Sequence, residues 1–198
     1  LMKKIINEPT QVVDEMLQGL SFMHDDLVQR LDGFDVIVRK AEKTGKVGLI
    51  SGGGSGHEPS HAGFVGDGML SAAICGAVFT SPTPDQILEA IKAADEGAGV
   101  FMVIKNYSGD IMNFEIAQEL AEMEGIDVAS VVVDDDIAVE NSLYTQGRRG
   151  VAGTILVHKI LGDAARSGKS LAEMKELADK LVLEIKTIGL ALSGATVP

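Results

Sequence analysis

The residues best suited to chemistry lie in a glycine-rich segment, GGGSGHEP at residues 52–59, which directly follows an apolar run at residues 47–50. Glycine has no Cβ, so its backbone N–H groups can approach a small polar ligand closely, and several in succession form a concave donor surface. His57 adds a side chain that exchanges a proton near neutral pH. The segment therefore predicts a ligand-binding loop rather than a turn alone.

A second candidate segment, KNYSGD at residues 105–110, closes the apolar run at residues 100–104. Lys105 can donate a hydrogen bond to a substrate oxygen, and Asp110 can accept a proton from a hydroxyl. Asp110 also stands just ahead of a helical pattern, where an aspartate commonly caps a helix. The two roles are compatible, because one carboxylate oxygen can cap the helix while the other faces a cleft.

Three consecutive acids at residues 134–136 could bind a divalent metal. Consecutive side chains point in different directions, and no EF-hand spacing accompanies them, so a solvated loop with one acid turned inward is favoured. The segment GRRG at residues 147–150 could bind an anion or pair with these acids, and we favour the pairing.

The histidines offer one metal-binding pattern, HEPSH at residues 57–61, which matches the H-E-x-x-H of zinc metalloproteases. Pro59 lies only two residues into any helix that begins at His57, so both histidines would lie in a frayed first turn. No third ligand follows, and we predict no metal site. His24 and His158 lie in helical segments, as surface or core residues.

Two nucleotide-binding patterns fit poorly. A dinucleotide G-x-G-x-x-G read from Gly52 requires glycine where the chain has His57, and no clear acidic ribose partner follows about 20 residues later. The sequence GKS at residues 168–170 resembles the end of a Walker A motif, but Asp163 replaces its first glycine and the segment joins two predicted helices. The chain therefore has no recognisable nucleotide loop.

Apolar runs alternate with helical patterns along the chain. Strands are expected at residues 47–51, 70–75, 100–104 and 128–133, and helices at residues 10–21, 59–64, 83–94, 111–124, 151–166 and 170–187. Thr83 with Pro84 marks one helix start, and Ser170 with Glu173 forms a capping box at another. This alternation predicts an α/β fold of three layers: a parallel or mostly parallel sheet with helices on both faces.

Ligands of such sheets bind beyond the carboxyl ends of the strands. Three predicted strands end there in polar segments, at residues 52–59, 105–110 and 134–136. We therefore expect these three segments to meet at one edge of the sheet and to form the functional site.

Composition excludes several classes of protein. The 198 residues suit one domain, and a net charge of −12 argues against nucleic acid and anionic membrane as partners. No apolar stretch is long enough to span a membrane, and the first residues reach Glu8 before any signal-peptide core develops. Cys75 is the single cysteine, so no internal disulfide can form, and we predict a reduced, cytoplasmic setting.

Four motifs, in this order, resemble the dihydroxyacetone kinase family. They are GGGSGHEP at residues 52–59, FTSPTPD at residues 79–85, KNYSGD at residues 105–110, and the stretch from DDD at residues 134–136 to GRRG at residues 147–150. The resemblance spans nearly the whole chain and is to the substrate-binding subunit, or to the equivalent domain of ATP-dependent enzymes. It implies that residues 1–198 form an N-terminal substrate-binding domain without the C-terminal domain.

The resemblance also implies site residues. Gly54, Ser55, Gly56 and His57 are expected to contact dihydroxyacetone, with Lys105 and Asp110 lining the same pocket. Asp110 would accept the proton of the attacking hydroxyl, His57 would polarise the bound substrate, and Lys105 would orient it. In the family the ketone is held as a hemiaminal on a histidine of the second half, which none of the four histidines here matches.

The resemblance places the phosphoryl donor elsewhere. ATP or ADP with Mg²⁺ is expected on a partner subunit or fused domain, the donor being ATP or a phosphotransferase relay, and no cofactor is expected on this domain. A homodimer is implied as well. The alternative is a non-catalytic relative that binds the same ketone as a transcriptional coactivator. The presence of His57, Lys105 and Asp110 favours the enzyme, because a sensor does not need a general base.

Overall fold

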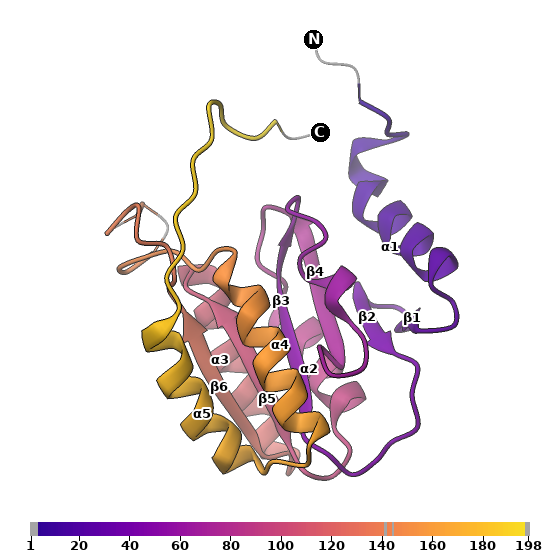
Figure 1. Ribbon diagram of the computed structural model, residues 1–198. Helices are drawn as coiled ribbons and strands as arrows, with labels where there is room; N and C mark the ends of the chain where they lie inside the picture. The colour runs from indigo at the N-terminus through magenta and orange to yellow at the C-terminus, as the bar shows by residue number, and fades with distance from the viewer. Residues whose placement is uncertain (1–3, 141, 144, 197–198) are drawn as a thin grey trace.

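The computed structural model describes residues 4–140, 142–143 and 145–196, built around one six-stranded sheet (Figure 1). In spatial order the strands are β1 (Val28–Arg30), β2 (Val36–Arg39), β4 (Ala72–Val78), β3 (Gly48–Ser55), β5 (Val100–Lys105) and β6 (Val128–Val133). The helices are α1 (Val12–Met23), α2 (Pro84–Ala94), α3 (Ser108–Met123), α4 (Gly153–Arg166) and α5 (Leu171–Glu184), with short 3-10 helices η1 (Pro9–Gln11) and η2 (Ala62–Phe64).

The sheet is mostly parallel, as predicted. β4, β3, β5 and β6 run parallel to one another. β1 and β2 were not predicted, and they extend the sheet beyond β4 with antiparallel pairing. The parallel part is the part that carries the predicted polar strand ends.

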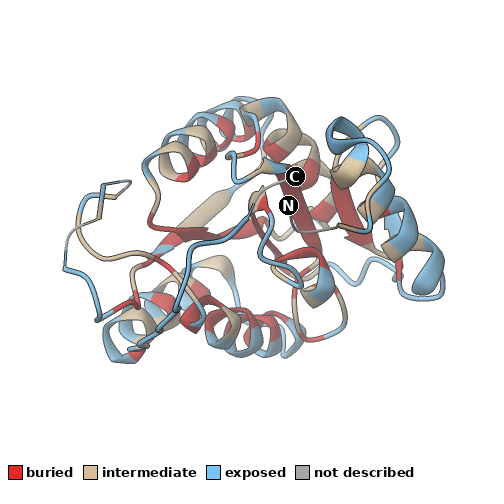
Figure 2. Cartoon of the chain, turned by 90° about the horizontal axis from the view of Figure 1, so that it is seen from above, coloured by how far each residue is buried: buried red, intermediate tan, exposed pale blue. Residues whose placement is uncertain are grey.

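Helices cover both faces of the sheet, which confirms the three layers (Figure 1). Leu49 and Phe101 pack with residues of α1, α4 and α5 on one face. Their neighbours Ile50 and Met102 pack with residues of α2 and α3 on the other face. Because successive side chains of a strand point to opposite faces, both β3 and β5 read as continuous apolar runs. Figure 2 shows the buried sheet between exposed outer helix faces.

The glycine run is part of β3, and the prediction that the strand ends at Ser51 was wrong. Gly52, Gly53 and Gly54 pair with β4 in parallel register, opposite Ile74, Cys75 and Gly76. A Cβ on Gly52 would lie 2.6 Å from the carbonyl oxygen of Ile74, and one on Gly54 would lie 2.4 Å from the nitrogen of Thr80. These glycines therefore permit close packing within the sheet, and the loop proper starts at Gly56.

The helix predicted at residues 59–64 was also wrong. Only Ala62–Phe64 forms a 3-10 turn there. The segment is short and contains Pro59 and Gly63, two residues that disfavour a helix, so no stable α-helix nucleates. The other five predicted helices are present with their ends shifted by less than one turn, and the capping box of Ser170 and Glu173 opens α5 as predicted.

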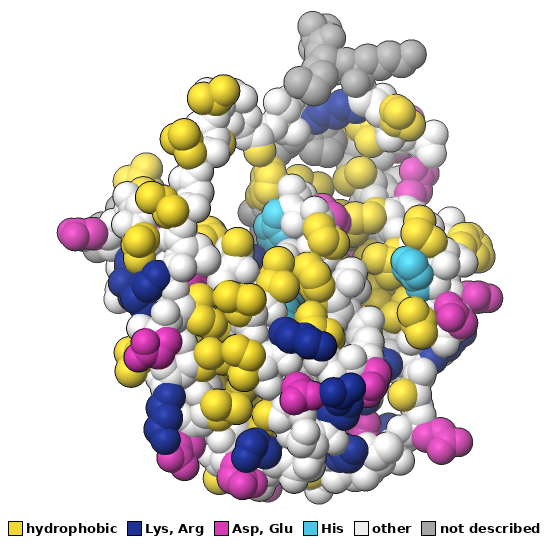
Figure 3. Space-filling model, viewed as in Figure 1, with side chains coloured by type: hydrophobic (Ala, Val, Ile, Leu, Met, Phe, Trp, Pro, Cys, Tyr) yellow, Lys and Arg dark blue, Asp and Glu magenta, His cyan; other side chains and the backbone are white. Residues whose placement is uncertain are grey.

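Hydrophobic side chains gather over α4 in Figure 3, where Leu156 and Ile160 are exposed. Within the part of the chain that the structure describes, no helix is long and apolar enough to cross a membrane.

Candidate functional site

The carboxyl ends of β3, β4 and β5 surround a pocket of about 240 Å³. Its lining consists of Gly54, His57, Phe79, Ser81, Lys105, Tyr107 and Asp110. The structure thus brings together two of the three predicted strand-end segments, residues 52–59 and residues 105–110. The third, residues 134–136, does not line this pocket.

Lys105 is the last residue of β5 and is buried. Its Nζ atom lies 3.0 Å from Nε2 of His57. Burial lowers the pKa of Lys105, and the nearby carboxylate of Asp110 opposes that shift. A buried ammonium held between a carboxylate and an imidazole is well placed to hydrogen-bond an oxygen of a small polar ligand.

Asp110 lies in the first turn of α3 with 3% of its surface exposed. The prediction that it caps this helix was wrong, because α3 begins at Ser108 and its N-cap is Tyr107. The carboxylate is therefore free of a capping role and accepts a hydrogen bond from the hydroxyl of Ser81. Burial raises the pKa of Asp110, while Ser81 and Lys105 lower it. A desolvated carboxylate of raised pKa is a stronger base than an exposed one.

The hydrogen bonds of His57 define its tautomer. Nδ1 lies 3.1 Å from the carbonyl oxygen of Ser60, which can only accept, so Nδ1 carries the proton. Nε2 then has a free lone pair and accepts from the ammonium of Lys105. Loss of water around the ring and the charge of Lys105 both lower the pKa of His57. The ring is thus a neutral acceptor facing the pocket.

Two predicted site residues lie just outside the lining. The hydroxyl of Ser55 donates to the carbonyl oxygen of Gly76 at 2.8 Å, so it is used inside the sheet. Gly56 has a φ of 120°, and a Cβ there would lie 2.6 Å from the ring of Phe79. Both residues shape the wall rather than face the pocket.

Three lining residues were not predicted: Phe79, Ser81 and Tyr107. Phe79 and Ser81 follow β4, whose carboxyl end lies at the same edge as those of β3 and β5. Their segment, residues 79–85, was predicted as a helix start and as one of the four family motifs, but neither prediction placed these two residues in the pocket. The rule that ligands bind beyond parallel strand ends would have found them once β4 was placed beside β3.

Comparison with known proteins identifies the family. A model of the Dak1 domain matches residues 18–198. The chain belongs to the Dak1 domain family.

Relatives of this Dak1 domain are dihydroxyacetone kinase proteins. It is 70% identical over 196 residues to the dihydroxyacetone-binding subunit of a PTS-dependent dihydroxyacetone kinase from Lactococcus lactis, covering 99% of the chain and 59% of that subunit. The dihydroxyacetone kinase of C. freundii, solved with AMP-PNP and Mg²⁺, is 40% identical with a TM-score of 0.84, over 91% of this chain and 34% of that one.

A third relative is not described as a kinase. It is a dihydroxyacetone kinase operon co-activator, 43% identical with a TM-score of 0.78, over 84% of this chain and 51% of that one. This Dak1 domain thus spans a third to about three fifths of these longer proteins. The fold and the family are shared by all three.

The acidic segment of the Dak1 domain has a structural role. Asp135 and Asp136 are both 1% exposed, so the prediction of a solvated loop with one inward acid was wrong. Asp135 accepts from the backbone nitrogens of Val151 and Gly153 at the start of α4, at 2.8 and 2.7 Å. Asp136 pairs with Arg149 at 2.6 Å, as predicted for the GRRG segment. The fold tolerates burial of these two charged groups because both oxygens of each carboxylate accept hydrogen bonds.

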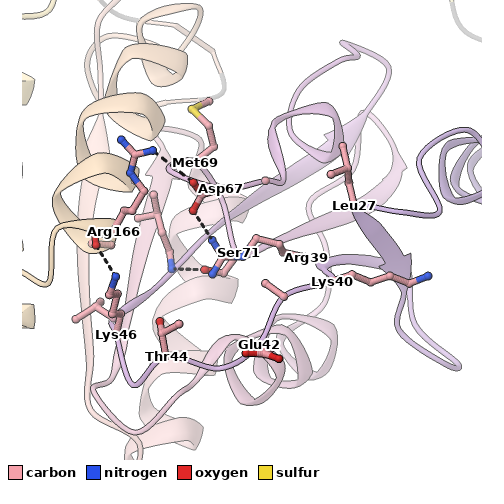
Figure 4. Close-up of a pocket in the computed structure, with 16 residues that line it drawn as sticks. Leu27, Arg39, Lys40, Glu42, Thr44, Lys46, Asp67, Met69, Ser71 and Arg166 are labelled. Carbon is pink, nitrogen blue, oxygen red and sulfur yellow. Dashed lines mark hydrogen bonds and ion pairs between the residues drawn. The ribbon is translucent and has the colours of Figure 1, made fainter.

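A larger cavity of about 270 Å³ lies at the opposite edge of the sheet (Figure 4). Its cations are already paired: Asp67 lies 3.8 Å from Arg39 and 3.4 Å from Arg166, and Lys46 donates to the carbonyl oxygen of Arg166 at 2.7 Å. It lies beside the amino ends of the strands and contains no group poised for proton transfer. The pocket at the carboxyl edge is therefore the candidate site.

Proposed function

We propose that this Dak1 domain binds dihydroxyacetone in the pocket at the carboxyl edge of the sheet, as part of a kinase that converts it to dihydroxyacetone phosphate. The observation that carries the proposal is the convergence of His57, Lys105 and Asp110 on a pocket of about 240 Å³. That volume suits a ligand of a few heavy atoms, and the described groups are those needed to bind and deprotonate a hydroxyl. The kinase relatives support this choice.

In the proposed mechanism Asp110 accepts the proton of the terminal hydroxyl as its oxygen attacks the phosphoryl group. Such a base contributes a factor of roughly 10²–10⁴ to the rate. Ser81 holds one carboxylate oxygen by hydrogen bonding, which leaves the other for the substrate. Lys105 donates a hydrogen bond to a substrate oxygen, and Nε2 of His57 then accepts from a substrate hydroxyl in place of Lys105. Gly54 contributes to the pocket wall. Phosphoryl transfer depends mainly on such positioning and charge stabilisation.

We propose that the phosphoryl donor is carried by a partner subunit or a fused domain. The glycine run lies within β3 rather than opening a helix, so it offers no nucleotide cradle. We therefore assign no nucleotide to this chain in the proposed mechanism.

The remaining proposals rest on the family. We propose a homodimer from the family resemblance, and a cytoplasmic location because Cys75, the single cysteine, cannot form an internal disulfide. We also retain the assignment of residues 1–198 to an N-terminal substrate-binding domain, with the covalent histidine in a further domain. We expect no nucleic acid as a partner, because a net charge of −12 repels a phosphate backbone.

A reconstituted assay tests the proposed activity. The complete protein that carries this chain is mixed with a nucleotide-bearing partner, dihydroxyacetone and either ATP or a phosphohistidine relay, and dihydroxyacetone phosphate is measured. We expect product with one of the two donors and none without the ketone. Calorimetric binding of the ketone without turnover by either donor would reject the kinase and support the co-activator function.

A further inference from the structure

Two buried histidines lie directly behind the proposed site and have no part in the mechanism above. His61 is 4% exposed and His158, on α4, is 0% exposed. Nδ1 of His61 lies 2.9 Å from Nε2 of His158, so one imidazole donates a hydrogen bond to the other. The two residues are 97 positions apart in the chain, and their bond ties the segment after β3 to a helix on the sheet face.

This bond is connected to His57 through a single peptide unit. The carbonyl oxygen of Ser60 accepts the Nδ1 proton of His57 at 3.1 Å. That carbonyl and the nitrogen of His61 belong to one planar peptide group, so holding His61 also holds the carbonyl. The rings of His57 and His61 also touch edge to face, with centroids 5.9 Å apart. The orientation of His57 therefore depends on where His61 is held.

Packing alone does not explain why two histidines occupy these buried positions. Nε2 of His61 and Nδ1 of His158 have no hydrogen-bond partner among the described residues. A buried polar group without a partner destabilises the fold, whereas two apolar groups of the same shape do not. Phe64 already packs against the ring of His158, so an apolar side chain would be accommodated there.

Both rings are held in the neutral state. Burial is the main cause that lowers the pKa of each, to about 3 for His158 and well below the ordinary value for His61, and the charge of Lys105 adds to it. A neutral pair keeps one N–H···N bond and adds no second positive charge beside Lys105.

We infer that the hydrogen bond between His61 and His158 is a positioning element of the site: it fixes the Ser60 carbonyl, which holds His57 as the Nδ1–H tautomer with Nε2 toward the pocket. The consequence for turnover rests on the proposed function. The tautomer itself does not, because it is a property of the chain without substrate.

Matched substitutions of His158 test this inference. A glutamine places its amide near the position of Nε2 and can still reach His61, whereas an asparagine is chemically the same but too short. We expect His158→Gln to keep His57 in the Nδ1–H form and His158→Asn to give a mixture of tautomers. His24→Gln is the control, because His24 is exposed at the end of α1.

The tautomer of His57 is measured by two-bond ¹H–¹⁵N correlation spectra of the chain labelled with ¹⁵N-histidine. The chain has four histidines, few enough for each ring to be assigned. In the complete kinase, His158→Asn should lower kcat about tenfold with KM changed less than about threefold, and His158→Gln should restore most of the loss. If His158→Asn does not fold, His158→Leu, which keeps the volume and removes the bond, carries the same expectation.

An unchanged Nδ1–H signal of His57 in folded His158→Asn or His158→Leu overturns the inference. The two proposals fail separately. If the wild-type kinase turns over normally but the tautomer of His57 is unchanged in the His158 variants, the proposed function stands and the positioning role is rejected. If the tautomer of His57 changes in the His158 variants but the wild-type protein has no kinase activity, the positioning role stands and the proposed function is rejected.

Discussion

Lys105 and Asp110 show how burial prepares a pocket for chemistry. Removal of water raises the pKa of the carboxyl and lowers that of the amine, and each charge opposes the shift of the other. The two groups are therefore little hydrated, and they act on a ligand through little intervening water. His57, accepting from Lys105, completes a row of groups that differ in charge and hydrogen-bonding role.

The buried state of His158 predicts how stability depends on pH. Folding lowers its pKa from the ordinary 6.5 to about 3, so between these values the unfolded chain binds a proton that the folded chain does not. Stability is therefore retained above the unfolded pKa and falls as the pH drops toward 3. Between pH 7 and pH 5, protonation of His158 in the unfolded chain should by itself lower the free energy of unfolding by roughly 2 kcal/mol.

Urea unfolding of the wild type and of His158→Gln at both pH values measures this contribution. The variant should lose less stability than the wild type on acidification, while His24→Gln should behave as the wild type does. Equal pH dependence in wild type and His158→Gln would show that His158 is not the group that titrates.

The site residues divide by what a sequence pattern can reveal. His57, Lys105 and Asp110 were predicted because each follows an apolar strand in a polar segment. The hydrogen bond of Ser81 to Asp110 could not be, because it depends on the neighbouring position of β4 in the sheet. The pairing of His61 with His158 joins residues 97 positions apart, and no local sequence pattern can pair residues at that separation.

The glycines of β3 make different contacts, and two substitutions separate them. A Cβ on Gly53 would lie 2.8 Å from Nζ of Lys105, the movable end of a side chain. A Cβ on Gly54 would lie 2.4 Å from the backbone nitrogen of Thr80, which cannot move without disturbing the turn after β4. Gly53→Ala should therefore fold and lose activity, while Gly54→Ala should lose stability.

We expect Gly53→Ala to lower kcat/KM at least about tenfold with an unfolding free energy within about 1 kcal/mol of the wild type, and Gly54→Ala to lose about 1–3 kcal/mol. Denaturant unfolding and initial-rate kinetics measure the two effects. Full activity in Gly53→Ala would mean that the position of Lys105 does not matter to the reaction.

The strands differ in how well their sequences announce them. β5 reads as an apolar run because helices bury both of its faces. β1 and β2 are three and four residues long, and each ends in a charged residue, Arg30 or Arg39, so their sequences resemble loops. The end of β3 was misplaced because glycine disfavours strands in general, and only the close approach of β4 explains it here.

For the molecule as a whole, the candidate site lies at one edge of the sheet, and ion pairs occupy the cavity at the other edge. The site is open, and the chain spans 59% of the Lactococcus lactis subunit that it resembles. We propose that the wall of Asp110, Lys105 and His57 acts within a larger assembly that supplies the phosphoryl donor. The proposed role of Asp110 can therefore be tested in the complete kinase.

The most direct measurement compares Asp110→Asn with the wild type in the complete kinase. Asparagine keeps the size and a hydrogen bond with Ser81 but cannot accept the hydroxyl proton. We predict that calorimetric affinity for dihydroxyacetone changes by less than about threefold while kcat falls at least about a hundredfold, within the range for a lost general base. Turnover that survives the substitution would contradict the role of Asp110 and with it the account of the site.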